Sequence, residues 1–151
     1  MPLSPGDAAP DFELMDQTLQ TVSLASLRGK TVVLLFYPMD FSPVCTQEHC
    51  GFGPAVGKIA PDGNTVVFGV NCDHPFSHQA FKKAYNIPYD LLSDPTRQMV
   101  KAYDMFGGDV PFNCAKRGTV VIGPDGRVKR VQNAGVDDVR TLESLVSLAS
   151  A

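Results

Sequence analysis

The sequence lacks the features that mark membrane, secreted and nucleic-acid-binding proteins. Its longest apolar run, Val32 to Tyr37, is far below the roughly 20 residues that span a bilayer. Four Cys in 151 residues are too few for the disulfide framework of a small secreted domain. Thirteen Lys and Arg against sixteen Asp and Glu give a net charge of -3, opposite in sign to a phosphate-tracking surface. We therefore expect no membrane partner and no nucleic-acid partner.

The composition is that of one globular domain. Hydrophobic residues make up 44% of the sequence and charged residues 19%, which excludes a disordered chain. The opening segment, MPLSPGDAAPDF, has no basic head followed by an apolar stretch, so no export signal is expected. We expect a single domain over residues 1–151, located in the cytoplasm, where free thiols are more often reactive or simply buried.

Gly and Pro residues divide the chain into alternating strands and helices. The expected strands cover residues 12–14, 21–24, 31–37, 65–70, 89–92, 119–122 and 127–131. The expected helices cover residues 44–52, 77–85, 94–103 and 139–148, the third opened by Asp94 and Pro95. This order predicts an α/β fold, a three-layer sandwich with a central mixed sheet and an N-terminal β-hairpin. The thioredoxin fold is one such arrangement, and the near-continuous apolar run from Thr31 to Tyr37 is the best candidate for the sheet centre.

The segment PMDFSPVCTQEHC, residues 38–50, follows that strand and carries the most unusual residues. Cys45 falls at or near the first turn of the next helix, where unpaired N–H groups and the helix dipole favour a thiolate. Ser42 can present a hydroxyl to the same place, and Arg117 adds a positive charge if its strand runs beside the first. Taken alone, however, a free cysteine is most often a small buried hydrophobe.

The surrounding pattern resembles the active site of the peroxiredoxins. The matching residues are Pro38, Ser42, Cys45 and Thr46 in the motif and, outside it, Gly6, Ala9, Pro10, Phe12, Phe36, Tyr37 and Arg117. The resemblance covers essentially the whole chain. With Cys50 five residues after Cys45, the chain is most similar to the bacterioferritin-comigratory, or Q, subgroup. Ser42 in place of the commoner Thr and Val120 in place of Phe depart from the pattern without removing a reacting group.

The resemblance implies a thiol peroxidase with no bound cofactor. Cys45 would attack the peroxide, Ser42 would hydrogen-bond peroxide and sulfur, and Arg117 would stabilise the developing charge. Pro38 would exclude water, and the backbone N–H groups of Val44 and Cys45 would complete the pocket. The implied substrates are hydrogen peroxide and organic hydroperoxides, and the implied reductant is thioredoxin or a glutaredoxin-like protein. The subgroup favours a monomer, with a dimer through the loop face around Phe41 or Phe106 left open.

Cys50 is the expected resolving cysteine. On an intact helix, residues five apart have Cα atoms roughly 8.7 Å apart, whereas a disulfide tolerates no more than about 7 Å. The helix must therefore unwind locally before Cys45 and Cys50 can join. Gly51, Gly53 and Pro54 weaken the helix after Cys50, which favours such unwinding. The alternative is that Cys50 only packs in the helix and an external thiol resolves Cys45.

The remaining thiols and imidazoles are expected to play lesser roles. Cys72 and Cys114 are interpreted as structural thiols, and His49, His74 and His78 lack the paired ligand spacing of a zinc site.

Two further residues lie on the helix that carries Cys45. His49 could act as a base in a cysteine hydrolase, but we expect it on the exposed side of the helix. Glu48, three residues after Cys45, is placed to orient Arg117.

Two other function classes stay open at this point. A thiol-disulfide carrier or redox sensor would use the same cysteines with negligible peroxidase turnover. A holdase-type chaperone would require exposed apolar surface.

Overall fold

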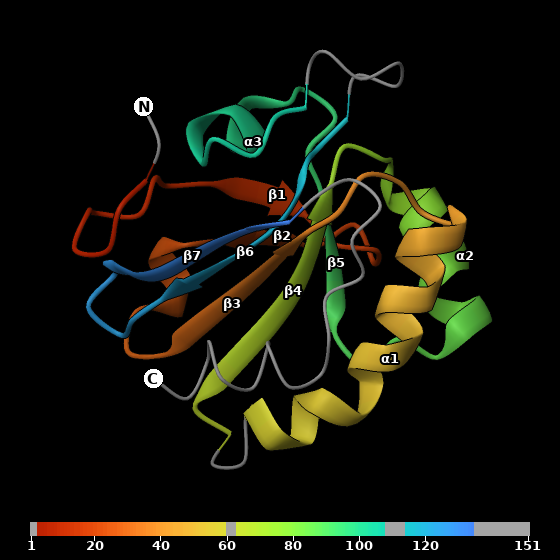
Figure 1. Cartoon of the computed structure of the whole chain (residues 1–151), viewed down its shortest axis with the longest axis horizontal. Helices are drawn as coiled ribbons and strands as arrows, with labels where there is room; N and C mark the ends of the chain where they lie inside the picture. The colour runs from red at the N-terminus through yellow and green to blue at the C-terminus, as the bar shows by residue number, and fades with distance from the viewer. Residues whose placement is uncertain (1–2, 60–62, 108–113, 135–151) are drawn as a thin grey trace.

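The computed structural model describes residues 3–59, 63–107 and 114–134, and its strands form a mixed sheet (Figure 1). Within these residues, seven strands follow the spatial order β2-β1-β5-β4-β3-β6-β7. The strands are β1 (Glu13–Met15), β2 (Thr21–Ser23), β3 (Thr31–Phe36), β4 (Thr65–Asn71), β5 (Asp90–Ser93), β6 (Arg117–Ile122) and β7 (Val128–Ala134). The helices are α1 (Pro43–Ile59), α2 (Pro75–Tyr85) and α3 (Gln98–Ala102), with a short 3-10 helix at Ala25–Leu27.

The sheet combines a parallel centre with antiparallel flanks. Strands β3, β4 and β5 are parallel and are connected through α1 and α2. Strand β6 pairs antiparallel with β3 and forms a hairpin with β7, while β1 and β2 form the N-terminal hairpin. The α/β fold with a mixed sheet and N-terminal hairpin predicted from the sequence is therefore confirmed.

Alternation along β3 places helices on both faces of the sheet. Leu34 and its same-face neighbours pack with Val100 of α3 and with Tyr103, which directly follows α3. Val33 and Leu35 point to the opposite face, in the cluster that contains Cys45, Phe52 and Phe81 from α1 and α2. Figure 1 shows α1 and α2 together on one side of the sheet and α3 away from them. The result is a three-layer sandwich with Cys45 in the layer of α1 and α2.

Two predictions about these elements need correction. The middle of the sheet is β4, not β3, because β6 and β7 add only two strands beyond β3. Helix α3 covers Gln98–Ala102 rather than residues 94–103, and its N-cap is Arg97. Asp94 instead accepts the Val100 N–H at 2.8 Å from outside the helix. The helix predicted over residues 139–148 lies outside the described residues.

Helix α1 is longer than the sequence predicts. It continues from Pro43 to Ile59, seven residues past the predicted end at Phe52. Pro54 has no N–H, so the Cys50 carbonyl loses the donor that an α-helix normally supplies from four residues ahead. Figure 1 shows the axis of α1 bending along its length. The Gly and Pro residues therefore weaken the helix after Cys50 without ending it.

No helix within residues 3–59, 63–107 and 114–134 is long and apolar enough to cross a membrane.

We predict that Gly118→Ala destabilises the protein. A Cβ at Gly118 would lie 2.6 Å from Met105 Sδ and 2.9 Å from the Gln132 carbonyl oxygen, which the β6-β7 pairing holds in place. Overpacking of this kind costs about 1–3 kcal/mol of unfolding free energy. Urea denaturation of the two proteins measures the loss.

Gly123→Ala is the matched control for this substitution. Its Cβ would lie 3.1 Å from atoms of Asp125 and Lys129, exposed side chains that can move aside. Equal unfolding free energies for the Gly118 and Gly123 variants would contradict the expected clash.

Candidate active site

Cys45 lies in the first turn of α1, directly after the chain leaves β3. It is the third residue of a helix that begins at Pro43, and its side chain is 0% exposed. The first α-helical hydrogen bond runs from the Thr46 N–H to the Ser42 carbonyl at 2.8 Å. The N–H groups of Val44 and Cys45 therefore lie in the turn that has no intrahelical acceptors. The predicted position of Cys45 at a helix start is confirmed.

Strand β6 brings Arg117 to this helix start. β6 pairs antiparallel with β3, with Gly118 opposite Phe36, so Arg117 enters the sheet where β3 ends. Its Nη2 donates to Cys45 Sγ at 3.2 Å, and its side chain is 1% exposed. The predicted proximity of Arg117 to Cys45, 72 residues away in sequence, is confirmed.

Glu48 fixes the orientation of the Arg117 side chain. Arg117 Nη1 donates to Glu48 Oε1 at 2.6 Å, and both side chains are buried. Burial alone would lower the pKa of Arg117, but the adjacent charges of Glu48 and Cys45 outweigh burial and raise it. Arg117 is thus a permanent cation shared between a carboxylate and a sulfur.

This arrangement can stabilise negative charge at one buried atom. A guanidinium donates its hydrogens in a fixed planar fork, which here is split between Glu48 and Cys45. In a site closed to water, such preorganised donors stabilise charge more strongly than they would in solution. Cys45 is consequently equipped to react as a thiolate nucleophile.

The other predicted site residues surround Cys45 at the end of β3. Pro38 is buried, while Ser42 and Val44 are half-buried. The Ser42 hydroxyl donates to the Met39 carbonyl at 3.1 Å, which closes a short turn before α1.

Cys50 lies on the opposite side of α1 from Cys45. Its side chain is exposed, whereas that of Cys45 is buried, and both are free thiols. Positions five apart on a helix are separated by about 140° around the axis. The structure brings Cys45 and Arg117 together but keeps Cys50 apart from them.

Cys72 and Cys114 have properties that oppose reactivity near neutral pH. Burial first, and then the charge of Asp94, raise the pKa of Cys72 to about 11. Burial likewise raises the pKa of the Cys114 thiol. Since the thiolate is the nucleophile, both thiols are poor nucleophiles at neutral pH.

His49 is buried, and its predicted exposure is wrong. It is 1% exposed, its ring meets Tyr37 edge-on with centroids 4.2 Å apart, and its Nδ1 is hydrogen-bonded to the Tyr89 hydroxyl. The buried face of α1 contains Cys45, Glu48, His49 and Phe52 at helical spacing. This spacing was available in the sequence and could have revealed the burial. The His49 ring is hydrogen-bonded to Tyr89, and Cys45 Sγ accepts a hydrogen bond from Arg117. These partners disfavour a cysteine hydrolase with His49 as base.

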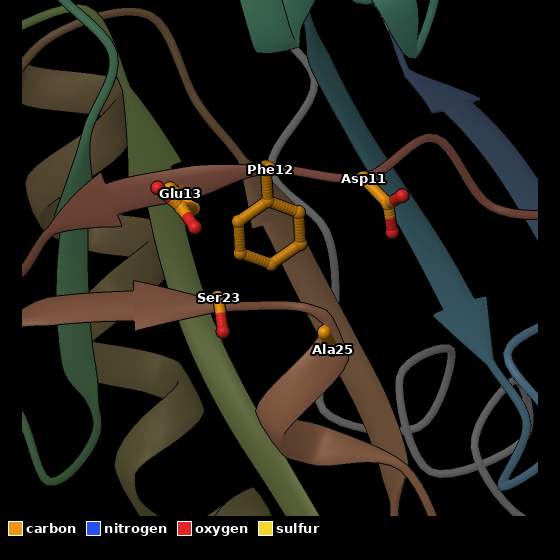
Figure 2. A pocket seen from close by; sticks show the side chains of 5 residues that line it. All are labelled: Asp11, Phe12, Glu13, Ser23 and Ala25. Atoms are coloured by element: carbon orange, nitrogen blue, oxygen red, sulfur yellow. The ribbon is translucent and has the colours of Figure 1, made fainter.

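A hollow lies elsewhere on the molecule, beside β1 and β2. It has a volume of about 350 Å³ and is lined by Asp11, Phe12, Glu13, Ser23 and Ala25. Figure 2 shows the Phe12 ring between the two carboxylates. Across residues 3–59, 63–107 and 114–134, no three or more His, Cys, Asp or Glu side chains group as metal ligands would.

Sequence reasoning missed one polar cluster beside the site. Asp40, two residues before Ser42, is buried and hydrogen-bonded to Tyr37, Ser77 and His78. From the sequence alone, His78 is a candidate only for a zinc site. Ser77 and His78 follow Asp40 by 37 and 38 positions in the sequence. No short-range pattern links residues this far apart, so only the fold reveals the cluster.

Comparison of the sequence and of the fold with known proteins finds the same family of proteins. The model of the AhpC/TSA family matches residues 5–131. The chain is 39% identical over 132 residues to peroxiredoxin Q, chloroplastic, of Populus jackii, which covers 85% of this chain and 59% of the relative. Its fold is similar to peroxidoxin BcpB of Mycobacterium tuberculosis, with a TM-score of 0.82 and 27% identity over 98% of this chain and 97% of that one. It is also similar to the reduced 2-Cys peroxiredoxin of Plasmodium vivax, with a TM-score of 0.86 and 27% identity over 99% of this chain and 82% of that one. The chain spans about three fifths of the length of the chloroplastic relatives it matches.

We predict that Glu48→Gln destabilises the fold. The substitution removes the buried charge that pairs with Arg117, and breaking a buried ion pair from one side costs about 3–5 kcal/mol. Urea denaturation measures the change.

Gln47→Glu, at the exposed neighbouring position, is the control and should change stability by less than about 0.5 kcal/mol. A Glu48→Gln protein as stable as this control would show that the buried pair contributes nothing to the fold.

The thiols should differ in their rates of alkylation by iodoacetamide. At pH 8 we expect exposed Cys50 to react at least tenfold faster than Cys72, whose pKa of about 11 leaves little thiolate. The Cys72 rate should rise about tenfold per pH unit up to its pKa. Peptide mass mapping after timed quenching measures both rates, with Cys72→Ser as the control for peak assignment. Equal labelling of the two thiols at pH 8 would contradict this order.

Proposed function

The chain belongs to the AhpC/TSA family, and we propose from that premise that it is a thiol peroxidase of the Q type. The observation that carries the proposal is the Arg117 Nη2 to Cys45 Sγ hydrogen bond of 3.2 Å in the first turn of α1. The proposed substrates are hydrogen peroxide and organic hydroperoxides.

The first step is displacement at the peroxide oxygen. The Cys45 thiolate attacks one oxygen, the O–O bond breaks with its electron pair on the other oxygen, and Cys45 becomes a sulfenic acid. The leaving hydroxide or alkoxide takes up a proton as water or alcohol. Arg117 stabilises the charge on the sulfur before attack and on the departing oxygen during it.

Other groups near Cys45 position the peroxide. The N–H groups of Val44 and Cys45, free of intrahelical acceptors, donate to the peroxide oxygens. The Ser42 hydroxyl exchanges its bond to Met39 for one to the substrate. Pro38, which is buried, helps exclude water from the sulfenic acid.

In the second step Cys50 resolves the sulfenic acid. Its thiolate attacks Cys45 Sγ, a disulfide forms, and hydroxide leaves as water. Because the two thiols lie on opposite sides of α1, residues 45–50 must unwind first. The missing N–H of Pro54 leaves the Cys50 carbonyl without its helical donor, so one hydrogen bond fewer has to break. Unwinding past Phe52 would cost roughly 1.5–3 kcal/mol more by exposing that buried ring.

A dithiol reductant then completes the cycle. We propose thioredoxin or a glutaredoxin-like protein, acting on the disulfide through exposed Cys50. We propose further that the protein acts as a monomer in the cytoplasm, a reducing compartment suited to its four free thiols. The plant relatives are named chloroplastic.

The alternative function, a thiol-disulfide carrier, fits the site less well. A carrier exchanges its disulfide with partner proteins through an accessible attacking sulfur. Cys45 is 0% exposed, which favours a small substrate over a protein disulfide.

The test is single-turnover oxidation by one equivalent of hydrogen peroxide. We expect the reduced protein to consume the peroxide within seconds and to lose two hydrogens by intact mass. Cys45→Ser should lose this reaction completely. Unchanged mass after minutes, or undiminished peroxide loss in the Cys45→Ser protein, would refute a thiol peroxidase.

Cys50→Ser separates the resolving step from the first step. This variant should still consume one equivalent of peroxide, gaining one oxygen by mass, but its thioredoxin-dependent turnover should fall at least tenfold. Cys72→Ser is the matched control and should turn over normally. Normal turnover of the Cys50→Ser protein would favour resolution by an external thiol.

A further inference from the structure

The loop between β3 and α1 has a backbone that must be held in place. Phe41 has a positive φ of 65°, an unfavourable conformation for a bulky residue. Its ring packs against Phe81, with centroids 5.1 Å apart, yet it remains 48% exposed. Strained residues persist only where their surroundings over-determine them. A strong anchor next to Phe41 is therefore required.

Asp40 is that anchor. Its Oδ1 accepts the Tyr37 hydroxyl at 2.6 Å and the Asn71 amide at 3.2 Å. Its Oδ2 accepts the Ser77 hydroxyl at 2.8 Å and meets His78 Nδ1 at 2.7 Å. These four partners come from the end of β3, the end of β4 and the first turn of α2.

Hydrogen bonds at both ring nitrogens hold His78 in one orientation beside Asp40. His78 Nε2 faces the Leu92 carbonyl at 3.0 Å, and a carbonyl only accepts, so Nε2 carries a hydrogen. Asp40 also accepts hydrogen bonds from Tyr37, Asn71 and Ser77, so both of its carboxyl oxygens are fully used. Asp40 and His78 therefore form a buried pair, with side chains 1% and 0% exposed.

A second carboxylate fixes the backbone of the same loop. Asp73 Oδ2 accepts the Asp40 N–H at 2.8 Å and the Asn71 amide at 3.1 Å. Asn71 Oδ1 in turn accepts the Asp73 N–H at 2.9 Å. The side chain of Asp40 is therefore bonded to the end of β4 and to the first turn of α2. Its backbone N–H is bonded to Asp73, which lies between these two elements.

We propose that Asp40, through its buried pair with His78, is a positioning residue for peroxide reduction. This inference rests on the proposed function. Asp40 holds the turn from which Ser42 and the first N–H groups of α1 meet the substrate. The pair lies outside α1, so it keeps the turn in place while residues 45–50 unwind and rewind in each cycle.

The test compares two reactions of Cys45 in a Cys50→Ser background, where oxidation stops at the sulfenic acid. Peroxide reduction requires an aligned substrate, whereas alkylation by iodoacetamide requires only an accessible thiolate. For Asp40→Asn we expect the second-order rate constant with hydrogen peroxide to fall at least tenfold. Alkylation of Cys45 should change less than threefold. Rapid-quench mass spectrometry measures both rates, and Glu13→Gln, an exposed carboxylate on β1, is the charge-matched control.

A double-mutant cycle isolates the pair. His78→Asn should slow peroxide reduction, and its effect should be strongly non-additive with Asp40→Asn, because either substitution breaks the same pair. His74→Asn, at an exposed histidine, is the matched control. Should these variants unfold, Ser77→Ala removes one bond to Asp40, leaves the pair with His78 and should slow the reaction two- to fivefold.

The outcomes separate this inference from the proposed function. A parent protein that fails to reduce peroxide overturns the peroxidase assignment itself. An active parent with unchanged rates in the Asp40→Asn or Ser77→Ala protein, or with equal losses of oxidation and alkylation, overturns the positioning role.

Discussion

The buried guanidinium of Arg117 is the constraint on which the site depends. It pairs with Glu48 and donates to Cys45, so it links the first two turns of α1 to the start of β6. A cation in the protein interior is tolerated only when it is paired and hydrogen-bonded. The same bonds that satisfy Arg117 thus fix the sulfur in one place. Stability and reactivity of this site come from one set of contacts.

The sheet topology makes that contact feasible. Antiparallel pairing of β6 with β3 delivers Arg117 to the point where β3 ends and α1 begins. On the other side, parallel pairing of β3 with β4 brings Asp40 to the end of β4 and to the first turn of α2. The start of α1 is therefore connected to two buried side-chain pairs, Arg117 with Glu48 and His78 with Asp40. Arg117 donates to the sulfur of Cys45, and Asp40 lies in the turn that precedes α1.

Helix α1 combines a firmly packed face with a weak backbone. Glu48, His49 and Phe52 are each 1% exposed, so unwinding around Cys50 must disturb well-packed residues. Pro54 removes one hydrogen bond to the Cys50 carbonyl, which lowers the free energy needed to unwind the helix at that point. The helix is nevertheless continuous to Ile59. A sequence-based expectation of a helix end at Phe52 overestimates the effect of Gly and Pro, because Gly only weakens a helix interior and Pro can kink a helix without ending it.

The order of strands and helices, the start of α1 and the candidacy of Cys45 can all be predicted from the sequence, because local periodicity and helix-start chemistry are encoded in short segments. Cys50 and Arg117 become candidates through the resemblance to the peroxiredoxin pattern. The burial of His49 and the contact of Asp40 with His78, 38 residues away, emerge only from the folded chain. The tertiary structure also decided that β4 rather than β3 is the middle strand. Contacts between distant residues depend on how strands pair, and strand pairing is a property of the whole sheet rather than of any one segment.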